Sequence, residues 1–198
     1  GAVRESDFRL VEAPLAPLQP GQFRIRTLYL GVAAVMRGYM LNTEKFERPL
    51  ELGDVMHGRG VGRIIESRHP GFEVGEIVHG KLGWQDYAIA DGSPYYLMYK
   101  VHQRVAPVST ALGVLGLTGF TAYLGLVDVG AVRPGDTVLV SGAAGGVGSS
   151  VGQVARNLGA TAVGIAGSAA KCELLTSRLG YRAAIDYRRE DVERRIGE

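Results

Sequence analysis

The residues best suited to chemistry lie in a glycine-rich stretch, residues 141–150, which reads Ser-Gly-Ala-Ala-Gly-Gly-Val-Gly-Ser-Ser. It follows the β-branched and apolar run Thr137–Val140, a composition that is typical of a strand. A tight turn from such a strand into a helix points unpaired backbone N–H groups at whatever lies above the strand end. Gly145 and Gly146 would let a phosphate approach this backbone, and Gly148 would let the helix pack closely on the strand.

The segments after this turn give it the context of a dinucleotide-binding unit. Apolar residues recur at helical spacing up to Gly159, and two further strands are expected at residues 161–165 and 183–186, separated by a helix that ends at Gly180. The apolar positions of the first helix are Val147, Val151, Val154, Ala155 and Leu158. This alternation predicts a parallel sheet whose first strand, Thr137–Val140, is buried on both faces. The alternative is a structural turn in a chain with 29 glycines, but the context favours nucleotide binding.

The end of the second expected strand indicates which dinucleotide would bind. The segment reads Ile165-Ala-Gly-Ser-Ala-Ala-Lys171, without the acidic residue that would hold the ribose 2′-OH of NAD(H). We expect Ser168 to cap the next helix, so that Lys171 lies in its first turn. A cation there opposes the helix dipole at a cost of about 0.3–1 kcal/mol, which a 2′-phosphate would turn into a favourable pairing. With Tyr187 and two arginines after the third strand, the sequence predicts NADPH; a solvent-exposed lysine is the alternative.

These segments resemble the zinc-independent branch of the medium-chain dehydrogenase/reductase superfamily. They are most similar to the group of NADP-dependent prostaglandin reductases, leukotriene B4 12-hydroxydehydrogenases, plant double-bond reductases and bacterial curcumin reductases. The resemblance covers nearly the whole chain. The stretches that carry it are Ala143-Ala-Gly-Gly-Val-Gly148, Gly167-Ser-Ala-Ala-Lys171, Asp186-Tyr187, Asp7-Phe-Arg-Leu-Val-Glu12, Met36-Arg-Gly38, Gly62-Arg-Ile-Ile-Glu-Ser67, Gly83-Trp-Gln-Asp-Tyr87 and Gly116-Leu-Thr-Gly-Phe-Thr-Ala-Tyr123.

The resemblance implies an α/β protein of two domains. A GroES-like, β-rich barrel at residues 1–112 would be the substrate and catalytic domain, and residues 113–198 would begin a Rossmann NADP-binding domain, with the active site in the cleft between them. The residue pattern agrees, since the first half contains short strand-like runs between glycine and proline turns. The expected elements are strands at 8–12, 23–30, 60–67, 74–78 and 85–90, an extended loop at 13–21, a short helix at 32–40 and an apolar helical stretch at 110–127 interrupted at Gly116 and Gly119.

The resemblance also assigns candidate cofactor residues. Those that match the pyrophosphate turn of the family, or its 2′-phosphate and adenosine contacts, are Gly145, Gly146, Val147, Gly148, Ser168, Lys171 and Tyr187. Thr121 would lie at the domain junction, close to the nicotinamide. A Rossmann sheet should continue past a third strand, so we expect the chain to be a fragment or part of a longer protein. The catalytic residues are then expected beyond residue 198.

The candidate substrate pocket departs from the family pattern. Val35 and Arg59 stand where plant double-bond reductases have tyrosines that contact the substrate, and Tyr39 would line the same pocket. Arg59 would either meet an acidic group of the substrate or serve a structural role. The substrate itself is expected to be a small unsaturated carbonyl compound.

No metal is expected at this site. The four histidines have no ligand-like spacing, and there is one cysteine, Cys172. The segment that supplies a zinc ligand in zinc-dependent relatives reads Gly58-Arg59-Gly60 here. By resemblance, hydride would pass from NADPH to the β-carbon of an enone or enal, and a tyrosine or water would protonate the resulting enolate. The alternatives are a quinone reductase of the same superfamily and a non-catalytic NADP-binding protein with a structural or sensing role.

Composition excludes several other classes of protein. The net charge of +2 is too small to indicate a nucleic-acid partner, and no apolar run is long enough to span a bilayer. The chain opens without a signal-peptide pattern, and its single cysteine fits a reducing compartment. We therefore expect a cytoplasmic protein, and by resemblance a homodimer when full length.

Overall fold

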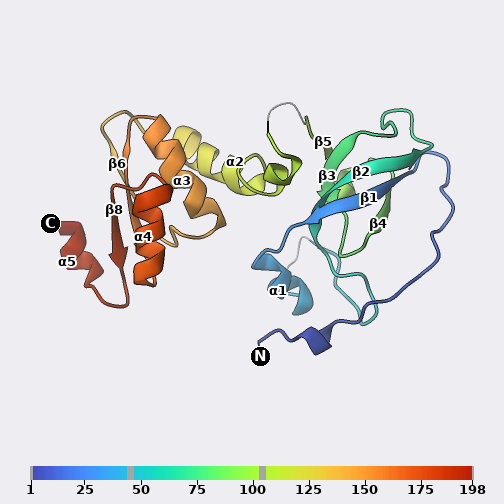
Figure 1. The fold of residues 1–198 in the computed structure, drawn as a ribbon, viewed down its shortest axis with the longest axis horizontal. Coiled ribbons are helices and arrows are strands. Elements are labelled where there is room, and N and C mark those ends of the chain that lie inside the picture. Colours follow the sequence, from blue (N-terminus) through green and yellow to red (C-terminus); the bar gives the residue numbers. More distant parts are fainter. Residues whose placement is uncertain (1, 44–46, 103–105, 198) are drawn as a thin grey trace. The chain divides into compact units, whose positions relative to one another are not determined.

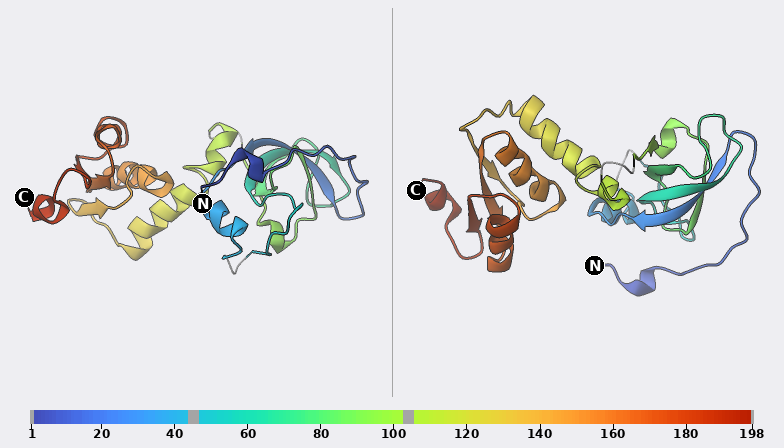
Figure 2. Two further views of the ribbon diagram at one scale, coloured as in Figure 1. Left: turned by 90° about the horizontal axis from the view of Figure 1, so that it is seen from below. Right: turned by 45° about the horizontal axis from the view of Figure 1, so that its top comes forward.

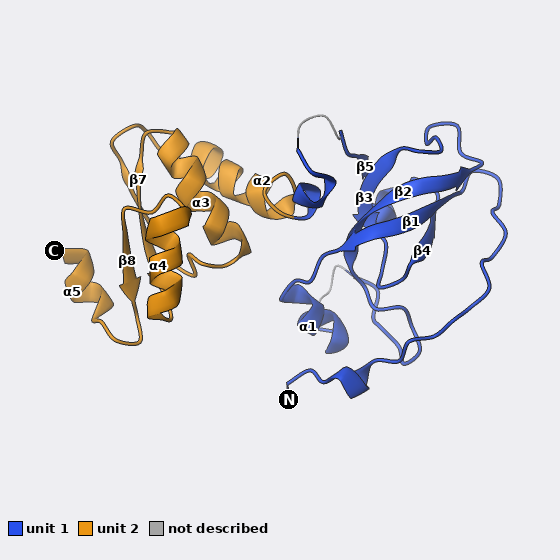
Figure 3. Cartoon of the chain, in the orientation of Figure 1, with its two compact units in different colours: residues 1–112 blue, residues 113–198 orange. Residues whose placement is uncertain are grey.

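The computed structural model describes residues 2–43, 47–102 and 106–197, and the chain divides into two compact units. Unit 1 comprises residues 1–112 and unit 2 comprises residues 113–198 (Figure 3). Unit 1 contains an antiparallel sheet and unit 2 a parallel one, so the chain is of the α/β class. Each unit has its own buried apolar residues and is described by itself below.

Unit 1 is organised around a five-stranded sheet in the order β4-β1-β2-β3-β5 (Figure 1). Every neighbouring pair of strands is antiparallel. The strands are β1 (Phe23–Leu30), β2 (Arg59–Ser67), β3 (Ile77–Lys81), β4 (Tyr87–Ala90) and β5 (Tyr99–Lys100). The core is formed by the fully buried Phe23, Ile25, Ile64, Val78 and Leu82.

The start of β1 departs from the alternation expected for a half-buried strand. Phe23, Arg24 and Ile25 are all buried, and a register irregularity falls between Arg24 and Ile25. The Arg24 side chain is tolerated inside because it donates to Glu66 Oε2 at 3.0 Å and to the Ala16 carbonyl at 2.8 Å. These contacts also fix residues 13–21, which form the loop without helix or strand that the prolines predicted.

The remaining elements of unit 1 are short helices. They are the 3₁₀ turns η1 (Glu5–Asp7), η2 (Pro94–Tyr96) and η3 (Val108–Leu112), and the α-helix α1 (Val35–Met40). Helix α1 begins three residues later than predicted. Strands β3 and β4 also begin later than predicted, because Gly75 adopts φ +95° in a turn before β3 and residues 84–86 bend before β4.

The strand predicted at residues 8–12 is wrong. These residues run outside the sheet without regular structure (Figure 2), and the side chain of Leu10 is 96% exposed. Apolar alternation alone does not make a strand, because its N–H and C=O groups also need a partner, and none of the described sheet strands pairs with this segment. The Phe8 ring nevertheless stacks on Trp84, with 5.2 Å between ring centroids.

Unit 2 contains the predicted alternation of strands and helices. Its parallel strands lie in the order β6-β7-β8, and the two connecting helices end before Gly159 and Gly180, whose φ angles of +77° and +78° suit glycine. The elements are α2 (Leu117–Leu124), a single π-helical turn η4 (Gly125–Val129), β6 (Thr137–Val140), α3 (Gly146–Asn157), β7 (Thr161–Ala166), α4 (Ala169–Arg178), β8 (Ala183–Asp186) and α5 (Val192–Gly197).

Burial and helix bounds in unit 2 correct two sequence predictions and leave a third open. Leu139 of strand β6 is 46% exposed in these 198 residues; because they are expected to hold only the first half of a Rossmann sheet, burial of β6 on both faces stays a prediction. Right-handed crossovers place α3 and α4 on one face of the sheet (Figure 1), and Leu139 lies on β6 away from that cover. The buried positions of α3 include Gly148, Gly152 and Ala155, whereas Val147 is exposed. Gly119 lies within α2 and does not interrupt it, because it allows the helix to approach the Val114 carbonyl.

Among the helices of the described residues, none combines the length and the apolar character needed to cross a membrane.

A buried histidine lies on β3. His79 is 3% exposed, its Nδ1 atom is buried without a hydrogen-bond partner, and its ring stacks on Tyr99 with 4.6 Å between centroids. Burial, together with the positive charge of Arg59, lowers the pKa of His79 from 6.5 to about 4. The ring is therefore neutral at pH 7 and adds no charge to the interior of unit 1.

This histidine should make the stability of unit 1 depend on pH. Because the folded-state pKa lies below that of the unfolded chain, its contribution is complete above pH 6.5 and is lost as pH falls toward 4, by about 3 kcal/mol. Urea unfolding followed by the fluorescence of Trp84, the single tryptophan, measures this loss. His79→Phe keeps a ring against Tyr99 and should flatten the profile over that pH range. The control His102→Phe, at an exposed site, should leave the pH dependence of the unfolding free energy unchanged. If His79→Phe also left it unchanged, the lowered pKa of His79 would be contradicted.

Candidate functional site

The glycine-rich turn of unit 2 connects β6 to α3. Gly142 has φ +57°, and the Ala143 N–H donates to the Ile165 carbonyl at 3.1 Å, which ties the turn to β7. Gly145 is the N-cap residue of α3, with extended backbone angles and no side chain to cap the helix. The first-turn amides of Gly146 and the residues after it are therefore open to an outside acceptor, as the sequence predicted for an anion site.

The same turn requires glycine for close packing. A Cβ atom at Gly148 would lie 2.5 Å from the carbonyl oxygen of Ala143, closer than any side chain allows. A Cβ at Gly146 would lie 3.2 Å from Thr118 Cγ2, so α2 also borders the turn. The turn is therefore enclosed by its own backbone on one side and by α2 on another.

Tyr181 holds this turn from the side of α4, and sequence reasoning missed it. Its hydroxyl donates to the Gly148 carbonyl at 2.7 Å in a buried hydrogen bond, and its ring fits where Gly152 has no side chain. Burial raises the pKa of Tyr181 to about 12, so the phenol remains a donor at neutral pH. The available signal was its position directly after Gly180, where a residue following a helix end packs back on the helix.

The start of α4 agrees with the predicted cap. Ser168 has extended backbone angles, and its Oγ accepts a hydrogen bond from the Lys171 N–H at 3.4 Å. Lys171 is therefore in the first turn of α4, where its side chain is exposed. The first turn contains no acidic residue, so a positive charge lies where the helix dipole favours a negative one.

Tyr187 lies beside this cap, directly after β8. Its N–H donates to the Ala166 carbonyl at 3.1 Å, and its ring covers Gly167, at which a Cβ would lie 2.8 Å from the phenol oxygen. The Arg188 guanidinium carbon lies 5.9 Å from the centroid of the Tyr187 ring. The neighbouring Asp186 is buried and accepts from the Arg188 N–H, so its carboxylate serves the local turn. Tyrosine, lysine and arginine thus gather at the carboxyl ends of β7 and β8.

Thr121, the predicted nicotinamide neighbour, lies on α2. Its hydroxyl donates to the Leu117 carbonyl of the same helix at 2.7 Å, and its side chain is exposed. The α2 residue whose side chain reaches the glycine turn is Thr118. A role for Thr121 stays a prediction.

The candidate substrate residues lie in unit 1 on two elements. Val35 and Tyr39 are one turn apart on α1, and the Tyr39 ring meets the His57 ring edge-on, with 5.7 Å between centroids. Arg59 begins β2 and is half-buried, and its charge acts on His79 and Tyr99. The described contacts therefore give Tyr39 and Arg59 different neighbours.

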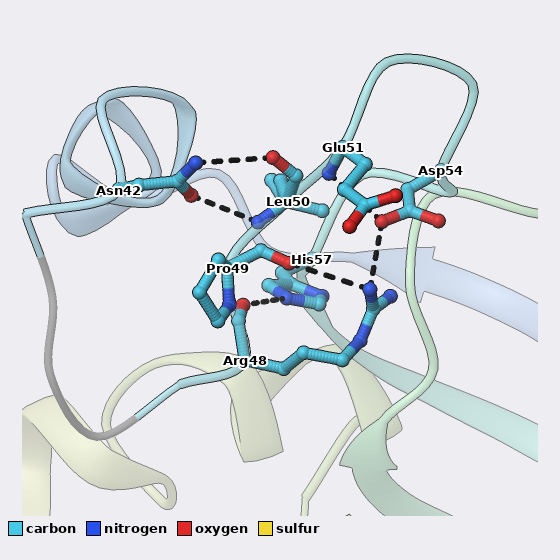
Figure 4. Close-up of polar contacts among 7 residues, drawn as sticks. All are labelled: Asn42, Arg48, Pro49, Leu50, Glu51, Asp54 and His57. Atoms are coloured by element: carbon cyan, nitrogen blue, oxygen red, sulfur yellow. Dashed lines mark hydrogen bonds and ion pairs between the residues drawn. The ribbon is translucent and has the colours of Figure 1, made fainter.

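The loop between α1 and β2 is held by polar contacts (Figure 4). Asn42 bonds both the N–H and the carbonyl of Leu50, and the Arg48 carbonyl lies 3.0 Å from His57 Nε2. Asp54 accepts from the Glu51 N–H at 2.9 Å and from Arg48 at 2.8 Å, and these two contacts lower the pKa of Asp54. His57, which precedes the segment aligned with a zinc ligand in other enzymes, thus has a structural role. Within the described ranges, no group of three histidine, cysteine or acidic residues is placed to hold a metal ion.

The known proteins that this chain resembles are oxidoreductases by their names. Residues 1–97 match a family described as the N-terminal domain of oxidoreductase. The chain is 39% identical over 198 residues to NADPH-dependent curcumin reductase of Escherichia coli (strain K12), covering 100% of this chain and 56% of that protein. It is 36% identical over 194 residues to the NADP(+)-dependent 2-alkenal reductase of Nicotiana tabacum, covering 96% of this chain and 56% of that protein.

A solved structure extends the likeness to three dimensions. The crystal structure of CurA in complex with NADPH from Vibrio vulnificus aligns with a TM-score of 0.86 at 37% identity, over 100% of this chain and 58% of that one. The similarity confirms the predicted fold class, a GroES-like β-rich domain followed by the first half of a Rossmann domain. The chain spans a little more than half the length of these relatives.

The close approach at the glycine turn should make Gly148→Ala destabilising. The added methyl group would press on the backbone of Ala143, and overpacking of this kind costs about 1–3 kcal/mol. Hydrogen–deuterium exchange of α3 peptides should show earlier opening in this variant. Gly125→Ala is the matched control, since its Cβ would meet open space in a helical backbone. Equal exchange in the two variants would contradict the packing role.

Proposed function

We propose that the chain is part of an NADPH-dependent reductase of C=C bonds, in the zinc-independent branch of the medium-chain dehydrogenase/reductase superfamily that its sequence resembles. The proposed substrates are small α,β-unsaturated aldehydes and ketones. The observation that carries the proposal is the pairing of an uncapped glycine turn with a lysine-bearing helix start at the end of β7. These two features offer separate groups to a pyrophosphate and to a 2′-phosphate.

We assign the cofactor to residues of unit 2. Those proposed to hold the pyrophosphate are Gly145, Gly146, Val147 and Gly148. Ser168 and Lys171 would hold the 2′-phosphate, with Tyr187 against the adenosine. Bound there, NADPH would supply a hydride for the β-carbon of the unsaturated carbonyl substrate. Tyr181 maintains the direction of the first-turn amides through its bond to the Gly148 carbonyl.

The residues of unit 1 complete the proposal. We place the substrate pocket at Val35, Tyr39 and Arg59, and Thr121 beside the nicotinamide. No metal ligand is proposed, since the aligned segment Gly58-Arg59-Gly60 offers a guanidinium where zinc-dependent relatives have an imidazole. A cytoplasmic location and a homodimer, both expected from the family, belong to the same proposal.

The choice of NADPH over NADH should depend on Lys171. Lys171→Ala is expected to raise the Kd of NADPH about tenfold and to leave that of NADH unchanged, because only NADPH carries the 2′-phosphate. Isothermal titration calorimetry with both cofactors measures this. Arg178→Ala removes a cation from the last turn of the same helix and serves as control. If Lys171→Ala raises the Kd values of NADPH and NADH equally, the assignment of Lys171 to the 2′-phosphate is wrong.

The reaction class is tested by turnover of NADPH with a panel of acceptors. We expect oxidation of NADPH, followed by its absorbance, with enals and enones and not with the corresponding saturated carbonyl compounds. Turnover confined to quinones would indicate the quinone reductase of the same superfamily. Cofactor binding without turnover across the panel would favour a non-catalytic NADP-binding protein. This alternative is supported by Val35 and Arg59, which stand where plant double-bond reductases have substrate-contacting tyrosines.

A further inference from the structure

Two cations lie directly opposite each other in the sheet of unit 1. Arg59 of β2 pairs in register with Lys81 of β3, an arrangement that is unfavourable when both charges remain unbalanced. Lys81 is balanced, because its Nζ lies 2.7 Å from Glu47 Oε1 and 4.7 Å from the centroid of the Tyr95 ring. Arg59 is half-buried, and its side chain makes no ion pair or hydrogen bond with the residues that the structure describes; its backbone carbonyl accepts from the Gly31 N–H at 2.9 Å.

The neighbours of Arg59 do not supply the missing negative charge. His79 lies on the adjacent strand, neutral at physiological pH, and its Nδ1 is sealed from solvent without a partner. Tyr99, stacked on His79, is 41% exposed, and its hydroxyl donates to the Ala111 carbonyl at 3.4 Å. Burial and the charge of Arg59 both lower the pKa of His79. For Tyr99, burial raises the pKa and the charge of Arg59 lowers it by a smaller amount. Among the described residues, this corner of the sheet therefore contains one positive charge without an ion-pair partner, beside neutral aromatic rings.

We propose that Arg59 forms an anion subsite that binds a carboxylate of the substrate. A guanidinium is suited to this task, since its planar fork can hold both oxygens of a carboxylate and its charge needs a partner when it is removed from water. The partly exposed Tyr99 side chain offers an aromatic neighbour for the body of the molecule. The inference deepens the proposed function by naming its substrate class as enones or enals that carry an acidic group.

A phosphate of the cofactor is the other anion that such a site would accept. The cofactor phosphates already have amides and a lysine assigned to them in unit 2. The substrate carboxylate is therefore the occupant that the arrangement favours, and cofactor binding becomes an arm of the test.

The test compares an acid with its ester. The probes are 4-oxo-4-phenylbutanoate and its methyl ester, which are saturated and therefore do not add to the Cys172 thiol. Isothermal titration calorimetry on the purified protein should give about tenfold tighter binding of the acid. Arg59→Gln should remove that difference, and Arg59→Lys should restore part of it because the charge is kept without the fork. Arg63→Gln, at an exposed position on the same strand, is the matched control.

The outcomes separate this inference from the proposed function. Loss of the acid preference in Arg59→Gln, with unchanged Kd values for the ester and for NADPH, supports the subsite. Equal binding of acid and ester by the wild type, or an acid preference that survives in both Arg59 variants, overturns it. A rise in the Kd of NADPH in Arg59→Gln, with acid binding unchanged, also overturns it and assigns Arg59 to the cofactor. Turnover of the methyl ester of 4-oxo-4-phenylbut-2-enoate by the full-length protein tests the reductase itself, since its absence overturns the proposed function whatever the acid preference.

Discussion

The structure of unit 2 depends on the space that two glycines, Gly152 and Gly164, leave for the Tyr181 ring. A Cβ atom at Gly152 would lie 2.4 Å from the Tyr181 ring, and one at Gly164 would lie 3.1 Å from it. The ring fills this space, and its hydroxyl donates to the Gly148 carbonyl at 2.7 Å. The hydrogen bond satisfies a buried polar group while the ring packs the two connecting helices together, so one side chain links the glycine turn to the end of α4.

The hydrogen bond from Tyr181 to the Gly148 carbonyl also sets the direction of the first-turn amides of α3. With Gly148 held from behind, the first-turn amides of α3 face away from Tyr181 and toward the carboxyl end of β6. The next helix start, at Ser168 and Lys171, lies one strand further along the same sheet edge. A dinucleotide has its charged groups spaced in the same way, with a pyrophosphate near its middle and, in NADPH, a phosphate on the adenosine ribose. The proposed cofactor therefore corresponds to the arrangement of the fold as well as to the names of the relatives.

Local chemistry explains what could be predicted from the sequence. The glycine turn, the Ser168 cap and the helix ends at Gly159 and Gly180 depend on neighbouring residues, so their patterns are readable along the chain. Features that depend on distant partners were not readable. Arg24 is buried because Glu66, 42 positions away, accepts its hydrogen bond, and Tyr181 meets Gly148 across 33 positions.

The central claim is that the protein directs hydride from NADPH to a carbon–carbon double bond. It is tested most directly by incubating the full-length protein that contains this chain with NADPH that carries two deuterium atoms at nicotinamide C4 and with 4-phenylbut-3-en-2-one. Nuclear magnetic resonance of the product then locates the label. The account predicts a saturated ketone with deuterium at the β-carbon. An allylic alcohol labelled at the former carbonyl carbon, or a failure to form labelled product, would contradict it.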